Sequence, residues 1–277
     1  MRLQRFVTAA GLAARRKASL LVRQGKVAVN GHVVRDPVAE IDAAHDDVRV
    51  EGKRAIIQDK ATVLLCKPRG VVTTLDDPEG RQTVIDLVRG VGARVVPVGR
   101  LDYHTEGVLL LTNDGELANT LLHPSRRVER VYHAKLKGTL AREDLEKLRR
   151  GVRLEDGVAR ADRVKVLAST GKHTWVELAL HEGRNRQIHR MALAIRHPVL
   201  KLARVSFAGL GVGDLRPGEW RYLTRAEIDR LRLAVTPPGA PDPDARSRDR
   251  AAGRWSRAGR GGSQARPGSR SDHRARR

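Results

Sequence analysis

One aspartate stands where a carboxylate can do covalent chemistry. Asp102 lies in a short polar stretch, Gly99 to Gly107, which leads into the apolar run Val108 to Leu111. A carboxylate in a loop between buried strands is held rigidly yet stays open to a substrate. The neighbouring Arg100 can favour its ionised form, which is the nucleophile. An isolated turn aspartate more often caps its own backbone, so the case for Asp102 depends on its surroundings.

The chain as a whole is strongly basic. It has 277 residues and a formal net charge of +22, which predicts a polyanionic partner. Nucleic acid is the first candidate. An anionic membrane surface is the competitor, but the sequence has neither a run of about eighteen apolar residues nor a signal-type start. We therefore expect a cytoplasmic protein with no membrane association.

Metal and redox chemistry have little support among the residue types. Cys66 is the only cysteine, which excludes an internal disulfide, a multi-cysteine zinc site and the usual zinc deaminase signature. His181 and His189 are eight residues apart with Gly183 between them, which is a poor spacing for a shared metal. These residue types therefore predict no metal site.

Residues 1–52 are predicted to form a small first domain. The spacing of apolar residues indicates a helix over 3–10 and a second helix over about 14–24. Two short strands then flank Asn30-Gly31, a pair typical of a two-residue hairpin turn because both positions favour positive φ. Two helices leading into a hairpin is therefore the expected order of elements.

This first domain carries unbalanced positive charge. From Arg2 to Lys26 there are seven basic residues and no acidic one. Arg15, Arg16 and Lys17 open the second helix, where cations oppose the helix dipole. Contact with phosphate accounts for such a placement, whereas a merely solvated face is the alternative. We expect these three residues and Lys26 to bind RNA.

A linker over about 52–60 is expected to lead into a larger domain, residues 60–235. Strands are predicted at 63–66, 95–98, 108–111, 131–136 and 175–180, and helices at 116–122, 140–150, 186–195 and after the capping box Thr224 to Glu227. The glycines at 209, 211 and 213 are expected in turns. This order indicates an α+β fold around a mixed, mainly antiparallel sheet.

The C-terminal stretch, residues 236–277, has almost no aliphatic bulk and is rich in Pro, Gly, Ser and Arg. It is predicted to be a disordered basic tail. Its eleven Arg and four Asp give a net charge of +7, which leaves +15 for the rest. The tail either strengthens non-specific RNA binding or is a dispensable extension, and composition favours neither.

Several motifs together resemble a known enzyme family. Gly99-Arg100-Leu101-Asp102 before a glycine and an aliphatic strand resembles the catalytic motif of pseudouridine synthases, in the branch that modifies ribosomal RNA, typified by the RsuA and RluB enzymes. The first domain resembles the alpha-L RNA-binding motif, first seen in a small-subunit ribosomal protein. The motifs follow one another in the expected order over roughly residues 1–235.

The resemblance implies an isomerisation of uridine to pseudouridine, which needs no cofactor. Asp102 would be the ionised nucleophile, forming an ester at ribose C1′ or taking a proton from C2′, and both routes are open. Tyr132 would stack on the flipped base, although core packing is the ordinary fate of a tyrosine. Leu202 would pack under the uracil, and Arg100 would contact phosphate or fill the space the nucleotide vacates.

The segment His181 to Met191 resembles the last family motif, a Gly-Arg turn that leads into a helix. Its basic residue pairs with the catalytic aspartate in the family, and the matching position here is His189, where the family usually has Arg or Lys. The pairing is therefore assigned to His189 or to Arg190. Arg184 is expected to bind substrate, and Arg69 and Arg81 are expected to contact the RNA backbone.

Two functions from different classes follow. The leading prediction is a ribosomal RNA pseudouridine synthase, acting on large-subunit ribosomal RNA, with the small-subunit RNA as the alternative substrate. The second is a non-catalytic RNA-binding or ribosome-assembly factor with the same fold, to which the unusual His189 gives some weight. The expected partner is ribosomal RNA or a pre-ribosomal particle, and the expected state is a monomer.

Overall fold

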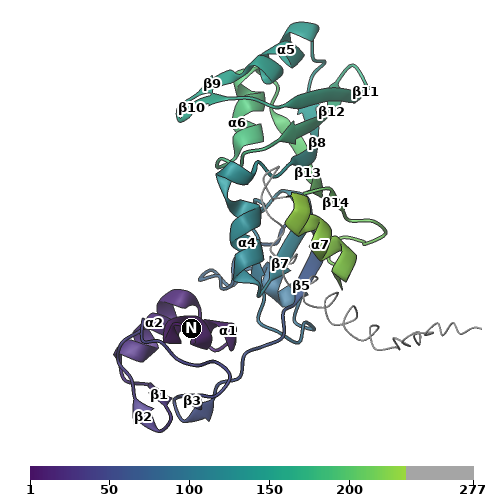
Figure 1. Ribbon diagram of the computed structural model, residues 1–277. Helices are drawn as coiled ribbons and strands as arrows, with labels where there is room; N and C mark the ends of the chain where they lie inside the picture. Colours follow the sequence, from purple (N-terminus) through teal and green to yellow (C-terminus); the bar gives the residue numbers. More distant parts are fainter. Residues whose placement is uncertain (235–277) are drawn as a thin grey trace, which may run out of the picture. The chain divides into compact units, whose positions relative to one another are not determined.

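Two short helices and a small four-stranded sheet open the chain (Figure 1). The two helices and the first hairpin were predicted, whereas the second hairpin was not. The computed structural model describes residues 1–234, and the predicted tail lies outside them. The elements of the first domain are α1 (Leu3–Ala9), α2 (Arg15–Arg23) and a sheet of order β2-β1-β3-β4 built from β1 (Val27–Val29), β2 (His32–Val33), β3 (Val48–Val50) and β4 (Lys53–Arg54). Their core is aliphatic, and Leu3, Val7 and Val22 are fully buried.

Two tight turns shape this small sheet. Asn30 and Gly31, with φ of 51° and 84°, join β1 to β2 as predicted. Glu51 and Gly52, with φ of 50° and 81°, make an equivalent turn between β3 and β4. The expectation of a linker from residue 52 is therefore wrong at its start, because Glu-Gly closes a hairpin here and Ala55 still packs in the core of the first domain.

The second domain is built on a nine-stranded mixed sheet. Strand order is β11-β12-β8-β13-β7-β5-β15, with β14 beside β13 and β6 beside β7. Among the described strands of this sheet, only β13 and β7 pair in parallel, which confirms the predicted fold class. The strands are β5 (Thr62–Lys67), β6 (Val96–Pro97), β7 (Glu106–Thr112), β8 (Arg130–Lys137), β11 (Arg163–Ser169), β12 (His173–Leu180), β13 (Val199–Phe207), β14 (Leu210–Gly211) and β15 (Trp220–Tyr222).

Helices cover the sheet and fix its loops. They are α3 (Val84–Leu87), α4 (Gly115–Leu122), the 3-10 turn η1 (Pro124–Arg126), α5 (Arg142–Arg150), α6 (Gln187–Ala194) and α7 (Arg225–Ala234), with a separate hairpin of β9 (Val152–Leu154) and β10 (Gly157–Ala159). Asp114 caps α4 through the amides of Glu116 and Leu117. Thr224 and Glu227 form the predicted capping box of α7.

Several elements differ from the sequence expectation. The helix expected from residue 140 begins at Arg142, and Ala141 is its N-cap residue. Gly211 pairs with Ser206 in β14 rather than forming a turn, while Gly209 and Gly213 do lie in turns with φ of 77° and 60°. The hairpin β9–β10 and the strands β11, β13 and β15 were not among the predicted elements.

The strand β7 lies between two aliphatic layers, and one of them anchors the loop that contains Asp102. Leu110 packs with the side chains of α4 and α7. Leu109 and Leu111 face the opposite side, where they share a core with Val84 of α3 and with Leu101, which is 5% exposed. Because Leu101 is buried there, the backbone beside it cannot move freely.

A single glycine allows the two halves of the sheet to join. β13 pairs with β7 only through Ala203 to Glu106 and Arg204 to Gly107. Gly107 has φ of 107°, and a Cβ at this position would lie 2.1 Å from the carbonyl oxygen of Arg204. Any side chain would therefore push β13 away from β7.

We expect Gly107→Ala to lower the free energy of unfolding by about 3 kcal/mol or more, because it adds a backbone clash to an unfavourable φ. Gly213→Ala is the matched control, since Gly213 also has positive φ (60°) but would meet nothing within 4 Å, and we expect it to cost about 1 kcal/mol. Urea unfolding of both variants measures the difference. Equal losses would contradict the packing argument.

Candidate active site

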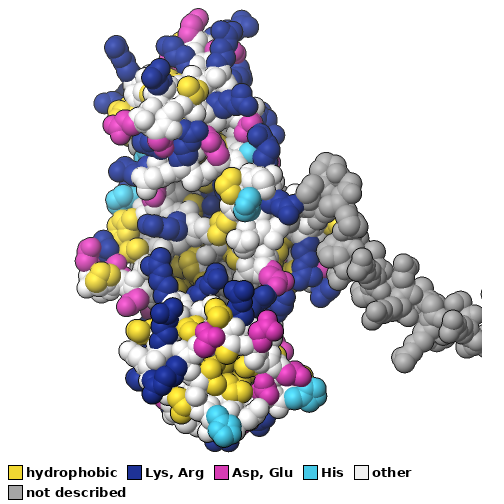
Figure 2. All heavy atoms as spheres, turned by 60° about the vertical axis from the view of Figure 1, so that its left-hand side comes forward, with side chains coloured by type: hydrophobic (Ala, Val, Ile, Leu, Met, Phe, Trp, Pro, Cys, Tyr) yellow, Lys and Arg dark blue, Asp and Glu magenta, His cyan; other side chains and the backbone are white. Residues whose placement is uncertain are grey.

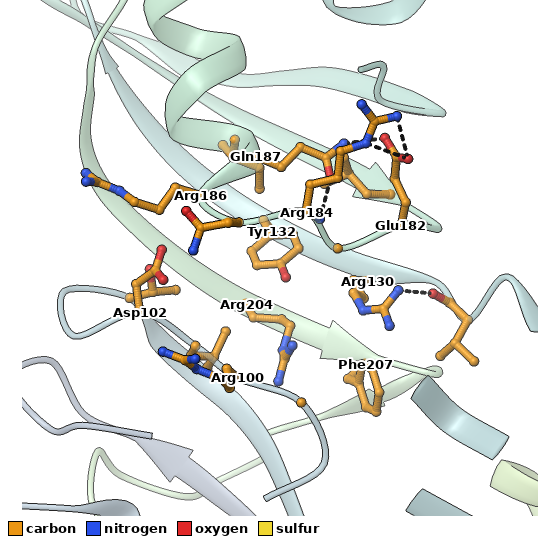
Figure 3. A pocket seen from close by; sticks show the side chains of 18 of the residues that line it. Arg100, Asp102, Arg130, Tyr132, Glu182, Arg184, Arg186, Gln187, Arg204 and Phe207 are labelled. Atoms are coloured by element: carbon orange, nitrogen blue, oxygen red, sulfur yellow. Dashed lines mark hydrogen bonds and ion pairs between the residues drawn. The ribbon is translucent and has the colours of Figure 1, made fainter. Parts of the chain in front are cut away.

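A cavity of about 600 Å³, called the central cavity below, is lined by the loop before β7, by β8 and β13, and by the turn into α6 (Figure 3). Six of the residues predicted to act on the substrate line it: Arg100, Asp102, Tyr132, Arg184, His189 and Leu202. Arg190 does not line it. The structure thus brings together motifs that lie up to about a hundred residues apart in the chain.

Asp102 is exposed at this cavity, and its position is set by the main chain. The amide of Thr105 donates to the carbonyl oxygen of Asp102 at 3.0 Å. The hydroxyl of Thr73 donates to the carbonyl oxygen of Leu101 at 2.7 Å. Among residues 1–234 the Asp102 carboxylate has neither a hydrogen-bond partner nor an ion pair, so it is open to a ligand.

A buried lysine holds the same loop from below. Lys67, at the end of β5, is 0% exposed. Its ammonium donates to the carbonyl oxygens of Pro68 (3.1 Å), Asp102 (3.2 Å) and Thr105 (3.0 Å). Burial lowers the pKa of Lys67 to about 8, against the opposing charges of Asp102 and Glu106. The sequence analysis missed Lys67, although its place at a strand end before Pro68 was a signal.

Arg100 lies apart from the carboxylate it was expected to support. It is exposed and lines the central cavity, but within the described residues it forms no ion pair with Asp102. Figure 3 shows the two side chains on different sides of the loop that carries them. Sequence neighbours in a turn point in different directions, so adjacency alone did not place this guanidinium.

Strand pairing supplies an apolar wall opposite Asp102. Tyr132 pairs with Arg204, and Ala134 pairs with Leu202, across β8 and β13. Alternate residues of a strand share a face, so Tyr132 and Leu202 reach the same side of the sheet. Leu202 is 6% exposed, and Tyr132 is partly buried against two aliphatic cores. The wall is suited to the flat face of a base.

The structure separates the two candidates for the basic partner of Asp102. His189 lines the cavity, and burial, followed by the charge of Arg186, holds its pKa below the ordinary value, although Asp102 opposes the shift. This shift disfavours the charged form of His189. Arg190 points elsewhere and binds Asp156 through two hydrogen bonds of 2.9 Å.

Arg186 is a cation that the sequence analysis did not select. It is exposed, lines the cavity and, among the described residues, has no carboxylate partner. In Figure 3 it lies on the same side of Tyr132 as Asp102. Its backbone has φ of 46° at the N-cap of α6, a conformation that costs free energy for a residue other than glycine. The signal in the sequence was the repeated arginine of the Gly-Arg-Asn-Arg turn.

Arg184 has a mainly structural setting, although it lines the cavity. Its Nη2 donates to Glu182 at 3.1 Å and to the carbonyl oxygen of Val158 at 2.9 Å. Gln187, which is 5% exposed, accepts from the amide of Arg184 at 3.1 Å and donates to Glu182 at 2.6 Å. This network fixes the turn that presents Arg186.

The cations predicted to bind RNA have different settings. Arg15, Arg16 and Lys17 are all exposed at the start of α2. The Nζ atom of Lys26 is 2.8 Å from Oε1 of Glu51, so this lysine forms an ion pair. Outside the first domain, Arg69 donates to a ring nitrogen of His104 at 3.5 Å, and Arg81 is bound to Asp77 at 2.8 and 3.0 Å. Arg81 therefore ties its own loop together.

The described surface is basic, in keeping with its share of the net charge. Figure 2 shows Lys and Arg side chains over the described surface that it presents, with Asp and Glu between them. Within residues 1–234, no helix combines the length and apolar character needed to cross a membrane. In the same part of the chain, His, Cys, Asp and Glu side chains form no group of three or more suited to a metal ion.

Known proteins share this combination of sequence and fold. Residues 61–194 match the family model described as RNA pseudouridylate synthase, and residues 1–48 match the S4 domain. A Bacillus subtilis protein named ribosomal large subunit pseudouridine synthase B is 44% identical over 233 residues, which cover 83% of this chain and 95% of that protein. The chain belongs to the RNA pseudouridylate synthase family. As a family member the synthase is an isomerase, as predicted.

Two further relatives agree with this membership. An Aquifex aeolicus protein named uncharacterized RNA pseudouridine synthase is 41% identical over 236 residues, 85% of the synthase and 95% of the relative. A crystal structure titled pseudouridylate synthase superposes with a TM-score of 0.58 at 28% identity, covering 83% of this chain and 99% of that chain. The predicted family, fold class and RNA-binding first domain are thus confirmed, while the roles of single site residues stay predictions.

Lys67 gives the synthase a pH-dependent contribution to stability. Its pKa is about 8 in the folded chain and has the ordinary value of 10.5 when unfolded. Between these values the unfolded chain binds more protons, so the stability that Lys67 contributes rises with pH. We expect the unfolding free energy of the wild type, relative to that of Lys67→Met, to increase as the pH rises from 8 to about 10.5. Urea unfolding across this range measures the gap, and a constant gap would contradict the assignment.

Proposed function

We propose that the protein converts a specific uridine of large-subunit ribosomal RNA into pseudouridine, with Asp102 as the nucleophile on a flipped-out nucleotide. One observation supports this most: the Asp102 carboxylate is exposed at a cavity of about 600 Å³ and has no partner among the described residues. A structural aspartate would be engaged by its own turn. An unengaged carboxylate beside an aromatic wall is suited to a nucleotide.

The chemistry needs one carboxylate and returns all atoms to the product. Asp102 attacks ribose C1′ as the C1′–N1 bond breaks, and uracil leaves as an anion. The uracil turns, its C5 attacks C1′, and the ester to Asp102 breaks. The C5 proton is then lost and N1 gains a proton, so the step is an isomerisation. The alternative, in which Asp102 first removes the C2′ proton, uses the same carboxylate.

The cavity residues divide this work by chemical type. Tyr132 and Leu202 both reach the side of the sheet that lines the cavity. Tyr132 stacks on the extruded base, and Leu202 packs under it. Arg186 and Arg100, which are exposed at the rim, bind phosphate groups of the same strand or balance the charge of Asp102. His189 lines the same cavity as Asp102, and burial holds its pKa below the ordinary value.

The choice of large-subunit RNA is supported by the names of relatives. The proteins from Bacillus subtilis and Vibrio cholerae, 44% and 38% identical to this chain, are both named ribosomal large subunit pseudouridine synthase B. Their shared name concerns those proteins, and the inference to this chain is ours. Small-subunit RNA remains the alternative that the experiment below distinguishes.

The two domains have different roles in this proposal. The first domain, predicted as 1–52 and extended by the structure to Ala55, holds RNA through Arg15, Arg16 and Lys17. The catalytic domain, residues 60–235, carries out the isomerisation. We propose that the protein works as a monomer in the cytoplasm, where ribosomal RNA or a pre-ribosomal particle is its partner.

Release of the C5 hydrogen tests the activity. Large- and small-subunit ribosomal RNA transcripts labelled with tritium at uridine C5 are incubated with the full-length protein. Tritium enters water only when a uridine is isomerised, and carbodiimide primer extension then locates the site. Release from the large-subunit transcript alone is the expected result. Release from the small-subunit transcript would redirect the substrate, and release from neither would favour a non-catalytic RNA-binding factor.

We expect Asp102→Asn to reduce tritium release by at least about a thousandfold, because an amide is a poor nucleophile and base. RNA affinity should stay within about twofold, since the substitution keeps the shape of the side chain. Asp214→Asn is the control, because Asp214 is another exposed aspartate in a loop and does not line the cavity. Undiminished turnover by Asp102→Asn would refute the assignment.

We expect Arg186→Gln to lower kcat/KM by about ten- to a hundredfold, the usual cost of removing a charged hydrogen bond. Arg190→Gln should change it far less, because Arg190 is bound to Asp156 outside the cavity. Steady-state kinetics of tritium release by both variants decide between them. A larger loss for Arg190→Gln would restore Arg190 as the partner of Asp102.

A further inference from the structure

Two of the arginines that line the central cavity, Arg130 and Arg204, are partly or fully buried and, within the described part of the chain, lack a carboxylate to neutralise them. Arg204 is 2% exposed and donates from Nε to the carbonyl oxygen of Val108 at 2.8 Å. Its Nη2 is buried and has no hydrogen-bond partner. Arg130 donates from Nη1 to the carbonyl oxygen of Val128 at 3.1 Å. Among residues 1–234, neither guanidinium forms an ion pair.

The pairing of β8 with β13 brings both arginines to one face of the sheet. Arg204 pairs with Tyr132, and Phe207 pairs with Arg130. Between Arg204 and Ser206 the register shifts by one residue, and such a bulge re-aims the side chains that follow it. The Phe207 ring thus reaches the cavity, with its centroid 4.9 Å from the Cζ atom of Arg204 and 5.5 Å from that of Arg130.

Phe207 does not replace an anion. The face of an aromatic ring attracts a guanidinium but has no net charge. Burial, together with the like charge of Arg204, lowers the pKa of Arg130. A buried guanidinium nitrogen without a partner also carries the cost of lost hydration. An anion that enters the cavity would relieve both the repulsion and the missing hydrogen bond.

We propose that Arg130 and Arg204 form a subsite for a phosphodiester group of RNA, adjacent to the nucleotide whose base lies against Tyr132. This builds on the proposed function. Figure 3 shows Arg130 on the far side of Tyr132 from Asp102, and Arg204 below the Tyr132 ring. An RNA backbone that continues from a ribose at Asp102 past Tyr132 would therefore come to Arg204 and Arg130. Guanidinium groups match phosphate oxygens with paired hydrogen bonds.

A second source of negative charge has to be distinguished from phosphate. Uracil becomes an anion when the C1′–N1 bond breaks, and two cations would stabilise it. The phosphodiester, however, is charged in bound RNA before any reaction. Binding to Asp102→Asn, which does not break the bond, therefore reports the phosphate and not the uracil anion.

The experiment measures binding of a short single-stranded RNA that has one uridine among cytidines, so that the uridine sets the register. Full-length Asp102→Asn protein is compared with the same protein carrying Arg130→Gln, Arg204→Gln or Arg225→Gln. Arg225 is the control, because it is exposed on α7, paired with Asp229 and outside the cavity. For either cavity variant we expect about tenfold weaker binding. The slope of the logarithm of the binding constant against the logarithm of the salt concentration should become smaller by about 0.7, as for one lost phosphate contact. The control should show neither change.

A neutral methylphosphonate, placed at each linkage in turn, identifies the phosphate. One position next to the uridine should weaken binding to Asp102→Asn about tenfold and have little further effect on Arg130→Gln. The proposal is overturned if no linkage shows this coupling, or if the cavity variants lose turnover while binding and salt dependence stay unchanged. Circular dichroism checks folding, and if Arg204→Gln does not fold, the partly buried Arg130 provides the same test.

The proposed function and this inference fail separately. Wild-type protein that releases no tritium while phosphate and Arg130 are coupled would refute the isomerase assignment for this RNA and leave the phosphate subsite intact. Tritium release without coupling would support the isomerase assignment and refute the phosphate subsite. Equal losses for Arg225→Gln would show that any cation on the surface matters, which also overturns the subsite.

Discussion

The geometry around Asp102 depends on one buried ammonium group. The turn after β5 and the loop before β7 leave carbonyl oxygens of Pro68, Asp102 and Thr105 pointing inward, and Lys67 donates to all three. Buried carbonyls need donors, and an ammonium has three protons to give. Since the loop is fixed through its main chain, the Asp102 side chain needs no structural partner and stays available to a substrate.

Most of the arginines that line the cavity lack the carboxylate partner that many other arginines of the described part have. Examples of paired arginines are Arg81 with Asp77, Arg190 with Asp156 and Arg221 with Glu227, and at the cavity Arg184 is paired with Glu182. Arg221 lowers the pKa of Glu227 to about 2. Arg130, Arg186 and Arg204 line the cavity without such partners. Because RNA brings its own negative charge, leaving these cations unpaired keeps them available for it.

The sequence predicted correctly the turns and helix caps that are determined by residues close together in the chain. The Asn30-Gly31 turn, the cap of α4 and the capping box of α7 all depend on residues within four positions of each other. β13 was missed because Lys201 and Arg204 interrupt its apolar alternation, and Arg204 is buried only through partners on β7 and β8. The role of Lys67 likewise depends on distant residues, since two of its acceptors lie 35 and 38 residues away, and its place before Pro68 was only a local signal.

His189 shows how the family resemblance and the structure complement each other. The resemblance indicates a basic group at this position, but partial burial and the charge of Arg186 lower the pKa of His189 and so disfavour its charged form. Positive charge on this side of Tyr132 then comes from the turn before α6, where Arg186 adopts a strained backbone. The hydrogen bonds of Arg184 with Glu182 and Gln187 offset that strain. An exposed cation at this part of the cavity is thus supplied by the turn before α6 and not by a charged residue at position 189 of the helix.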